Sequence, residues 1–325
     1  MRVLVTGATG FLGGALTRSL IARGDSVVAL GRNPAKLAAL AEPGVTTIEA
    51  DLARGQAAIP GAIGELDAVV HCAALSTQWA PRAAFEAANV TGTETALAVA
   101  RRSGARRFVN ISSPTVYFAL RDSEGVSETA SLPPAINDYA ATKAEAERRV
   151  LAERDLSPIS LRPRGIYGKG DSALLPRLIA AAERGPLPLL RGGAASIDLT
   201  HVSDVVSAIE AALVAGPDLS GEVFNISGGE ALPVRQIVEA AAARAGINVT
   251  WRRLPLTPVL AAARAIELAN RVIPLRREPR LTRYAVGLFA YRQSLDITKA
   301  ERVLGWSPKV RLQEGLDLTF GSDAR

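Results

Sequence analysis

The chain has 325 residues, of which 48% are hydrophobic, and a formal net charge of +6. This length and composition allow a large buried core and fit two closely joined domains. The single cysteine, Cys72, excludes an internal disulfide and indicates a reducing compartment, so we expect a cytoplasmic protein. No run of about twenty apolar residues occurs, which excludes a transmembrane helix.

The positive charge is local. Residues 251–292 contain nine Arg and two Glu, so the rest of the chain is close to neutral and no nucleic-acid partner is expected. The segment predicts a surface for acidic lipid or for substrate phosphate, and the first of these would be a peripheral membrane contact. The alternative is a solvated helical face without a partner. Its arginines interleaved with apolar residues are Arg252, Arg253, Arg276, Arg277, Arg280 and Arg283.

The first predicted strand, Arg2 to Val5, leads through a glycine-rich turn into a helix that begins near Phe11. Gly7 permits the tight turn, Gly10 allows backbone to approach a phosphate, and Gly13 lets the helix pack on the sheet. A pyrophosphate is expected there, facing the helix N-terminus; the alternative is a turn without a ligand. The candidate cofactor residues of the turn are Gly7, Thr9, Gly10, Phe11, Leu12 and Gly13.

Apolar runs of strand length alternate with helical segments along the next two hundred residues. Runs that are hydrophobic on both faces belong in a parallel sheet covered by helices. The pattern predicts an α/β fold, a Rossmann-type doubly wound parallel sheet, with ligands beyond the C-terminal ends of the strands. The predicted strands after the first are 26–30, 45–49, 67–71, 107–111, 158–162 and 222–226.

After the second predicted strand the chain places Arg32 where an NAD-selective enzyme commonly has Asp or Glu. A guanidinium pairs well with a 2′-phosphate, so NADP(H) is favoured, with NAD(H) as the alternative cofactor. The other interpretations of Arg32 are stacking on adenine and simple solvation.

Two further strand ends supply candidate cofactor contacts. Asp51 and Leu52 follow the third strand at the expected height of the adenine ring, and Ala73 and Ala74 follow the fourth and leave room for the cofactor. His71 and His201 are the only histidines and have no flanking Cys or carboxylate cluster, so we predict no metal site and structural roles for both.

The predicted chemical centre is Tyr139 with Lys143, one turn apart on a helix and therefore on one face. The neighbouring ammonium is expected to lower the tyrosine pKa, so that Tyr139 acts as general acid or base. Ser113, after the fifth strand, is expected to donate a hydrogen bond to the substrate oxygen. The alternative for the Tyr139–Lys143 pair is an exposed helical contact.

These motifs resemble the extended short-chain dehydrogenase/reductases of the NAD(P)-dependent epimerase/dehydratase superfamily over nearly the whole chain. The stretches that carry the resemblance are 6–13, 51–52, 71–74, 89–93, 112–113, 139–143, 162–168, 198–204 and 224–229. The resemblance implies a catalytic triad of Ser113, Tyr139 and Lys143. It also implies that Lys143 binds the nicotinamide ribose and that Pro163 and Ile166 line the nicotinamide.

Within that superfamily, absences narrow the reaction. Dehydratases carry acidic residues where Pro114 and Thr115 stand, and many sugar-nucleotide epimerases carry Asn in place of Gly165. The chain is most similar to the 3β-hydroxysteroid dehydrogenase-like branch, which includes 2-alkyl-3-oxoalkanoate reductases. We therefore expect hydride transfer between the cofactor and a ketone or secondary alcohol of a small hydrophobic substrate; the alternatives are a sugar-nucleotide epimerase and a non-catalytic NADPH-binding protein.

The expected domains are a dinucleotide-binding domain, 1–170 and 198–228, and a smaller, mostly helical substrate-binding domain, 171–197 and 229–325. Ser76, Trp79 and Tyr167 are the candidate substrate contacts. Apolar runs within 254–289 predict a lid over a greasy substrate or a membrane contact, with a packed helical core as the alternative. The sequence leaves two assemblies open, a monomer and a homodimer.

Overall fold

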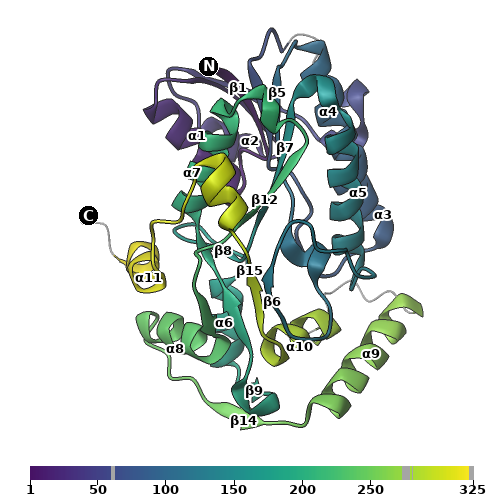
Figure 1. The fold of residues 1–325 in the computed structure, drawn as a ribbon, viewed down its shortest axis with the longest axis vertical. Coiled ribbons are helices and arrows are strands. Elements are labelled where there is room, and N and C mark those ends of the chain that lie inside the picture. The colour runs from purple at the N-terminus through teal and green to yellow at the C-terminus, as the bar shows by residue number, and fades with distance from the viewer. Residues whose placement is uncertain (60–62, 273–278, 280, 322–325) are drawn as a thin grey trace.

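The fold centres on one sheet of seven parallel strands (Figure 1). The computed structural model describes residues 1–59, 63–272, 279 and 281–321. The strand order is β12-β7-β5-β4-β1-β2-β3. The strands of this sheet are β1 (Arg2–Thr6), β2 (Ser26–Gly31), β3 (Val45–Glu49), β4 (Ala68–His71), β5 (Arg107–Ile111), β7 (Pro158–Pro163) and β12 (Glu222–Ile226).

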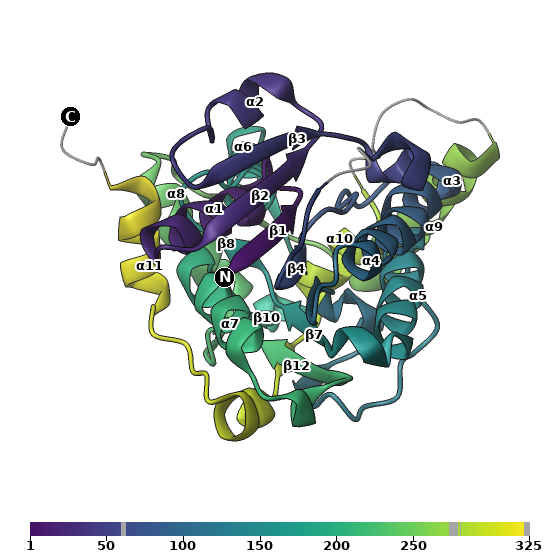
Figure 2. The ribbon, with the colours of Figure 1, turned by 90° about the horizontal axis from the view of Figure 1, so that it is seen from above.

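Helices cover both faces of the sheet, as the view from above shows (Figure 2). On one face, α1 (Phe11–Ala22) and α7 (Val202–Val214) bury apolar side chains in one core cluster. On the other face, α4 (Gly92–Arg102) and α5 (Asp138–Ala152) contribute to a second. Burial on both faces explains why the central strands are continuous apolar runs. The predicted Rossmann-type class is confirmed.

The strand order reverses between β1 and β4, which are neighbours although β2 and β3 separate them in sequence. In sheets of this kind the ligand crevice lies beyond the C-terminal ends of the strands at such a reversal. The glycine turn after β1 and the alanines after β4 both lie at this point. The topology therefore brings two of the predicted cofactor segments together.

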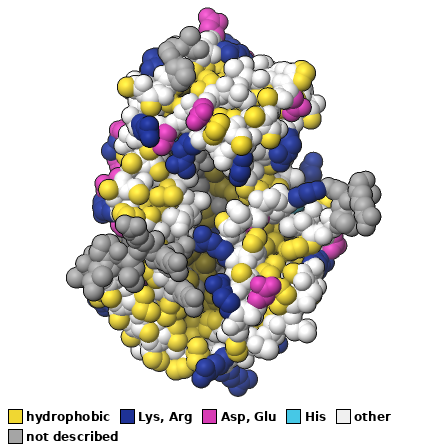
Figure 3. Space-filling view, turned by 180° about the vertical axis from the view of Figure 1, so that it is seen from behind, with side chains coloured by type: hydrophobic (Ala, Val, Ile, Leu, Met, Phe, Trp, Pro, Cys, Tyr) yellow, Lys and Arg dark blue, Asp and Glu magenta, His cyan; other side chains and the backbone are white. Residues whose placement is uncertain are grey.

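A second lobe lies below the sheet in Figure 1 and consists of helices with short two-stranded sheets. Its helices are α6 (Leu175–Glu183), α8 (Val234–Arg244), α9 (Leu256–Val272), α10 (Arg283–Ala290) and α11 (Leu312–Phe320). Its strands are β9 (Leu187–Leu189), β10 (Ser196–Asp198), β13 (Ala231–Pro233) and β14 (Trp251–Arg253). Figure 3 shows hydrophobic side chains gathered over this lower part of the molecule.

The two parts of the chain are joined by strand pairing next to the predicted site. β6 (Ser123–Val126), from the connection between β5 and α5, pairs in parallel with β15 (Gln293–Leu295) near the C-terminus. β8 (Ile166–Tyr167) pairs in parallel with β11 (Thr200–His201), and both strands belong to the predicted dinucleotide-binding domain. The domain limits remain a prediction, and Arg276, Arg277 and Arg280 of the basic segment lie outside the described residues.

Several details differ from the sequence pattern. A π-helix (Glu86–Thr91) directly precedes α4 and contains Asn89. β3 is the edge strand, so Thr46, Thr47 and Glu49 are exposed rather than buried. Two short helices, α2 (Pro34–Ala38) and α3 (Arg82–Phe85), complete the α-helices of the described residues. Among the described residues, no helix combines the length and apolarity that crossing a bilayer requires.

Candidate active site

The glycine turn is packed so tightly that two of its positions admit only glycine. Gly7 has φ +68°, and a Cβ added there would lie 2.9 Å from the backbone N and Cα of Ala73. A Cβ on Gly13 would lie 2.3 Å from the carbonyl oxygen of Gly7. The turn after β1, the start of α1 and the end of β4 are thus in direct backbone contact.

Gly10 differs from Gly7 and Gly13. The absence of a side chain there leaves space at the surface of the turn, whereas at the other two positions it avoids a clash inside the fold. The nearest atom to an added Cβ is the Gly7 oxygen at 3.1 Å. Gly10 is the N-cap of α1 and no side chain caps this helix end, so its first N–H groups are free to bind an anion. The turn therefore fits the pyrophosphate of a dinucleotide.

Arg32 directly follows β2 and is exposed. Thr9 occupies the space beside the adjacent Gly31, since its Cγ2 would lie 2.6 Å from a Cβ added to Gly31. The glycine turn and the end of β2 are therefore in contact. After β3, Asp51 caps a 3₁₀ turn by accepting a 3.1 Å hydrogen bond from Ala53 N, and Leu52 is buried. Arg32 and Asp51 are thus placed at the same end of neighbouring strands.

Ser113, Tyr139 and Lys143 converge beside the end of β5. Tyr139 begins the first turn of α5, which Asn137 caps by accepting a 2.9 Å hydrogen bond from Ala140 N. The phenol hydrogen-bonds with Ser113. Lys143 Nζ donates a 2.6 Å hydrogen bond to the carbonyl oxygen of Ile111, two residues before Ser113. All three side chains are buried, so the exposed helical pair that was the alternative is excluded.

Burial, rather than the charge of Lys143, determines the direction in which the pKa of Tyr139 shifts. Desolvation raises the pKa of Tyr139 to about 12, and the hydrogen bond with Ser113 opposes that rise. Burial also lowers the pKa of Lys143 to about 8, against the attraction of Glu147. The expectation that Lys143 lowers the pKa of Tyr139 is therefore wrong for this structure, because the ammonium is engaged by a backbone oxygen and the phenol has lost its water.

Sequence reasoning missed the residue that holds Ser113. The Ser113 hydroxyl donates a 3.0 Å hydrogen bond to Thr115 Oγ1 and accepts one from the Thr115 backbone N–H at 3.2 Å. In the sequence, Thr115 is informative only because dehydratases carry an acidic residue at its position. The Ser-Pro-Thr pattern at the start of a 3₁₀ turn is typical of such a hydroxyl cap, and it was the available signal.

A buried polar network supports the helix that carries Tyr139 and Lys143. Glu147, one turn beyond Lys143, accepts hydrogen bonds from Arg162 of β7, including one of 2.9 Å from Nε. Arg162 also donates to the Tyr117 hydroxyl, which donates at 3.1 Å to Asn225 of β12. The network links α5 to two strands, and pairing of the two buried charges limits their desolvation cost.

The connection after β4 carries Ser76 and Trp79 and contacts the start of α5. Asn89 accepts a 2.8 Å hydrogen bond from Leu75 N and donates at 3.1 Å to Thr142 Oγ1. Further along the connection, Gln78 accepts a 3.3 Å hydrogen bond from Asn137. The structure thus brings this connection to the tyrosine, with Ser76 exposed and Trp79 half-buried.

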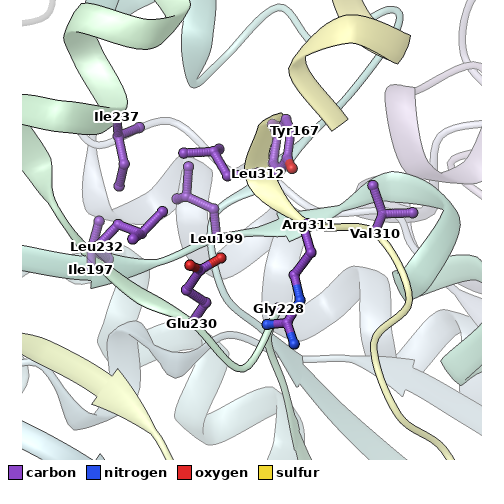
Figure 4. Close-up of a pocket in the computed structure, with 10 residues that line it drawn as sticks. All are labelled: Tyr167, Ile197, Leu199, Gly228, Glu230, Leu232, Ile237, Val310, Arg311 and Leu312. Carbon is purple, nitrogen blue, oxygen red and sulfur yellow. The ribbon is translucent and has the colours of Figure 1, made fainter. Parts of the chain in front are cut away.

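Tyr167 lies elsewhere, in the apolar core of the second lobe. It is 1% exposed, meets the His201 ring edge-on at 5.4 Å, and fills the space beside Gly315. It lines the pocket of Figure 4 with Leu199 and Leu312. That pocket encloses about 10 Å³, room for about one water. The substrate role of Tyr167 stays a prediction, and its surroundings favour packing.

Pro163 and Ile166 flank a reversal of the chain after β7. Pro163 pairs with Ile226 of β12, and Ile166 packs against the same core cluster as α7. Gly165 between them has φ +51°, and a Cβ there would lie 2.5 Å from Leu199 Cδ2. The asparagine that many epimerases carry at this position would require the Leu199 side chain to move.

Tyr284 of α10 is a second residue that sequence reasoning missed. Its charge interaction contributes to the raised pKa of Tyr139. Its ring lies 4.7 Å from that of Phe118, which follows the Ser113 turn. An aromatic pair between segments so distant in sequence leaves no local pattern.

His71 and Cys72, at the end of β4, are both held neutral by burial. His71 is buried between Thr6 and Thr93, at 2.8 and 3.1 Å, and burial lowers its pKa to about 3. Burial raises the pKa of the Cys72 thiol to about 12. No group of three or more potential metal-ligating side chains occurs within the described part of the chain. The structural role of His71 stays a prediction.

Comparison with known proteins agrees with this geometry. The model of the NAD dependent epimerase/dehydratase family matches residues 3–227. The chain is 36% identical over 334 residues to the 2-alkyl-3-oxoalkanoate reductase of Stenotrophomonas maltophilia (strain K279a), covering 100% of both chains. It is 35% identical to the 4-hydroxy-2-methyl-3-oxo-4-farnesyl-3,4-dihydroquinoline-1-oxide ketoreductase of Stigmatella aurantiaca, covering 98% of this chain and 95% of that one. The solved structure of MoeE5 in complex with UDP-glucuronic acid and NAD has a TM-score of 0.73 and 28% identity, with 98% of each chain covered.

The fold and the site define a Rossmann-type enzyme that uses a nicotinamide cofactor. The chain belongs to the NAD dependent epimerase/dehydratase family. The predicted resemblance to extended short-chain dehydrogenase/reductases is confirmed, as is the predicted oxidoreductase activity on hydroxyl or keto groups.

Proposed function

We propose that the protein is a cytoplasmic, NADP(H)-preferring reductase of ketones on hydrophobic substrates of the β-keto acid or 3-oxosteroid type. The observation that carries the proposal is the convergence of Ser113, Tyr139 and Lys143 beside β5. The relatives named above support the substrate class, since both reduce a 3-oxo group on a molecule with an apolar chain.

In this proposal the cofactor supplies or accepts a hydride at the substrate carbon. The Ser113 hydroxyl orients the carbonyl oxygen by donating a hydrogen bond that strengthens as negative charge develops. The Tyr139 phenol, protonated because burial raises its pKa, delivers its proton to that oxygen. Lys143 would bind the nicotinamide ribose.

The cofactor would lie across the turn after β1. The N–H groups at the start of α1 would bind the pyrophosphate, and Gly10 provides the space. The exposed guanidinium of Arg32 would pair with the 2′-phosphate of NADP(H). Asp51 and Leu52 would border the adenine, while Ala73, Ala74, Pro163 and Ile166 would border the path to the nicotinamide.

The test is a screen of β-keto acids, 3-oxosteroids and simple aryl ketones as substrates. NADPH oxidation is measured as the loss of absorbance at the nicotinamide band. Turnover with an apolar 3-oxo compound is expected. An epimerase would show no net oxidation, and a non-catalytic binding protein would bind NADPH without turnover. Size-exclusion chromatography of the same sample tests the homodimer that we propose as its assembly.

A further inference from the structure

Helix α9 is apolar on two opposite faces, although only one of them is buried. On the inner face, Val259, Leu260 and Ala263 belong to the core cluster that α10 forms with Val286 and Ala290. The outer face recurs with the same helical period, and its exposed apolar residues include Pro258, Ala262, Ala265, Ile266, Leu268 and Ala269. A helix on the surface of a soluble protein normally carries polar side chains on its outer face, so this apolar face indicates a partner.

The edge of this outer face is cationic. Arg264 is exposed on α9 itself, and Arg252 and Arg253 are exposed on β14, just before the helix begins. Figure 3 shows Lys or Arg side chains at the lower end of the hydrophobic area. Glu267 is the one acidic residue of the stretch 251–270, and it lies on the inner face in a 2.7 Å ion pair with Arg283 of α10. No carboxylate of this stretch therefore offsets the three exposed arginines.

This charge discriminates between the partners that an apolar helix face can have. A second copy packed on α9 would set one cationic edge against another, because the same stretch of that copy supplies arginines and no free carboxylate. A bilayer with anionic lipid offers an apolar layer for the outer face and negative head groups for the arginines. With 17 residues, α9 is about 25 Å long and presents several turns to such a surface.

We propose that α9 lies on the surface of an anionic phospholipid bilayer. Its outer face is at the boundary between head groups and acyl chains, and Arg252, Arg253 and Arg264 contact the head groups. This contact needs no refolding, because the inner face of α9 stays packed on α10. The inference goes beyond the reductase function and does not depend on which ketone is reduced.

The test measures flotation of the purified full-length protein with vesicles, without cofactor or substrate. One set of vesicles is phosphatidylcholine alone, and in the other about one third of the lipid is phosphatidylserine. Binding to the mixed vesicles is expected to be at least about tenfold stronger and to weaken as salt is raised. Leu268→Asp places a charge in the outer face and should reduce binding to the mixed vesicles by about tenfold or more.

Two control variants match these changes elsewhere on the surface. Leu318 of α11 and Leu268 are both 53% exposed, so Leu318→Asp makes the same change outside α9 and should bind as the wild type does. Arg264→Gln should weaken binding to the mixed vesicles about fivefold. Arg102→Gln, at the exposed end of α4, should leave it unchanged.

Equal binding of the wild type and Leu268→Asp to the mixed vesicles would overturn the proposal. Wild-type binding no stronger than to phosphatidylcholine alone would do the same. If the wild type instead formed a dimer that Leu268→Asp abolishes, without binding vesicles, the outer face of α9 would belong to a second copy. Each of these results would leave the reductase function standing, since NADPH oxidation is measured separately.

Discussion

Lys143 Nζ donates its 2.6 Å hydrogen bond to the Ile111 carbonyl oxygen across the gap between α5 and the end of β5. The ammonium is thereby held in a water-free position, with Glu147 one turn away as its nearest counter-charge along the helix. Burial outweighs this attraction and lowers the pKa of Lys143 from 10.5 to about 8. A charge that the fold disfavours at neutral pH indicates a side chain kept for function rather than stability.

The first prediction concerns the pH dependence of stability. The unfolded chain holds the Lys143 proton up to about pH 10.5, whereas the folded chain releases it above about pH 8. Wild-type stability should therefore rise between these values, by about 3 kcal/mol in total, relative to a Lys143→Met variant. Denaturant unfolding of both proteins at several pH values from 7 to about 10.5 measures the difference.

The comparison isolates one group, because the two proteins differ only at position 143 and share all their other titratable groups. Lys309→Met, at an exposed lysine, provides the control and should differ from the wild type by a constant. A stability difference for Lys143→Met that does not change between pH 8 and 10 would contradict the lowered pKa.

The second prediction tests the proton donor. Tyr139→Phe removes only the hydroxyl and keeps the buried ring, so NADPH affinity should be retained while kcat falls by roughly 10²- to 10⁴-fold. Calorimetry measures the affinity and NADPH oxidation the turnover. Tyr291→Phe, at a tyrosine of the second lobe beneath Arg191, is the control. Wild-type kcat in Tyr139→Phe would reject the assignment.

The third prediction separates the two uses of glycine in the first turn. A Cβ on Gly10 meets only the Gly7 oxygen at 3.1 Å, and one on Gly14 meets the Ala8 oxygen at 3.3 Å, so Gly10→Ala and Gly14→Ala should have similar thermal stability. Only Gly10→Ala fills the proposed phosphate space. Its Kd for NADPH is expected to rise at least tenfold, and equal Kd values for the two variants would place the pyrophosphate elsewhere.

The sequence was sufficient for features that depend on local pattern. Strand length, apolar runs and the glycine turn predicted the sheet, and the four-residue spacing placed Tyr139 and Lys143 on one helix face. The pKa values of Tyr139 and Lys143 could not be predicted from the sequence, because the degree of desolvation depends on contacts from distant elements. Tyr284 of α10 packs against Phe118, and Leu199 fills the space beside Gly165.

The fourth prediction concerns cofactor choice. Arg32 is exposed at the end of β2, so its replacement by alanine should not affect folding. Loss of a charge-assisted contact to the 2′-phosphate should reduce kcat/KM for NADPH by about 10- to 150-fold and leave the value for NADH unchanged. Arg102→Ala, at the exposed end of α4, is the control. An equal effect on both cofactors would show that Arg32 does not read the 2′-phosphate.

The last prediction is that Thr115 positions Ser113. Thr115→Val keeps the shape of this buried side chain and removes the oxygen that accepts the Ser113 proton at 3.0 Å. When the single Ser113 proton is donated to the substrate oxygen, the Thr115 hydroxyl can donate to Ser113 Oγ in turn and strengthen that bond. Thr115→Val removes this donor, so kcat should fall by about tenfold while NADPH affinity stays constant.

A purely structural role for Thr115 would change stability without this kinetic signature. Thr115→Ser restores the hydroxyl while lacking the methyl group, so it should recover kcat even where it lowers the melting temperature. If Thr115→Ser were as slow as Thr115→Val, packing of the methyl group rather than the hydrogen bond would set the rate. If Thr115→Val were as fast as the wild type, Ser113 would be oriented by the Thr115 backbone N–H alone.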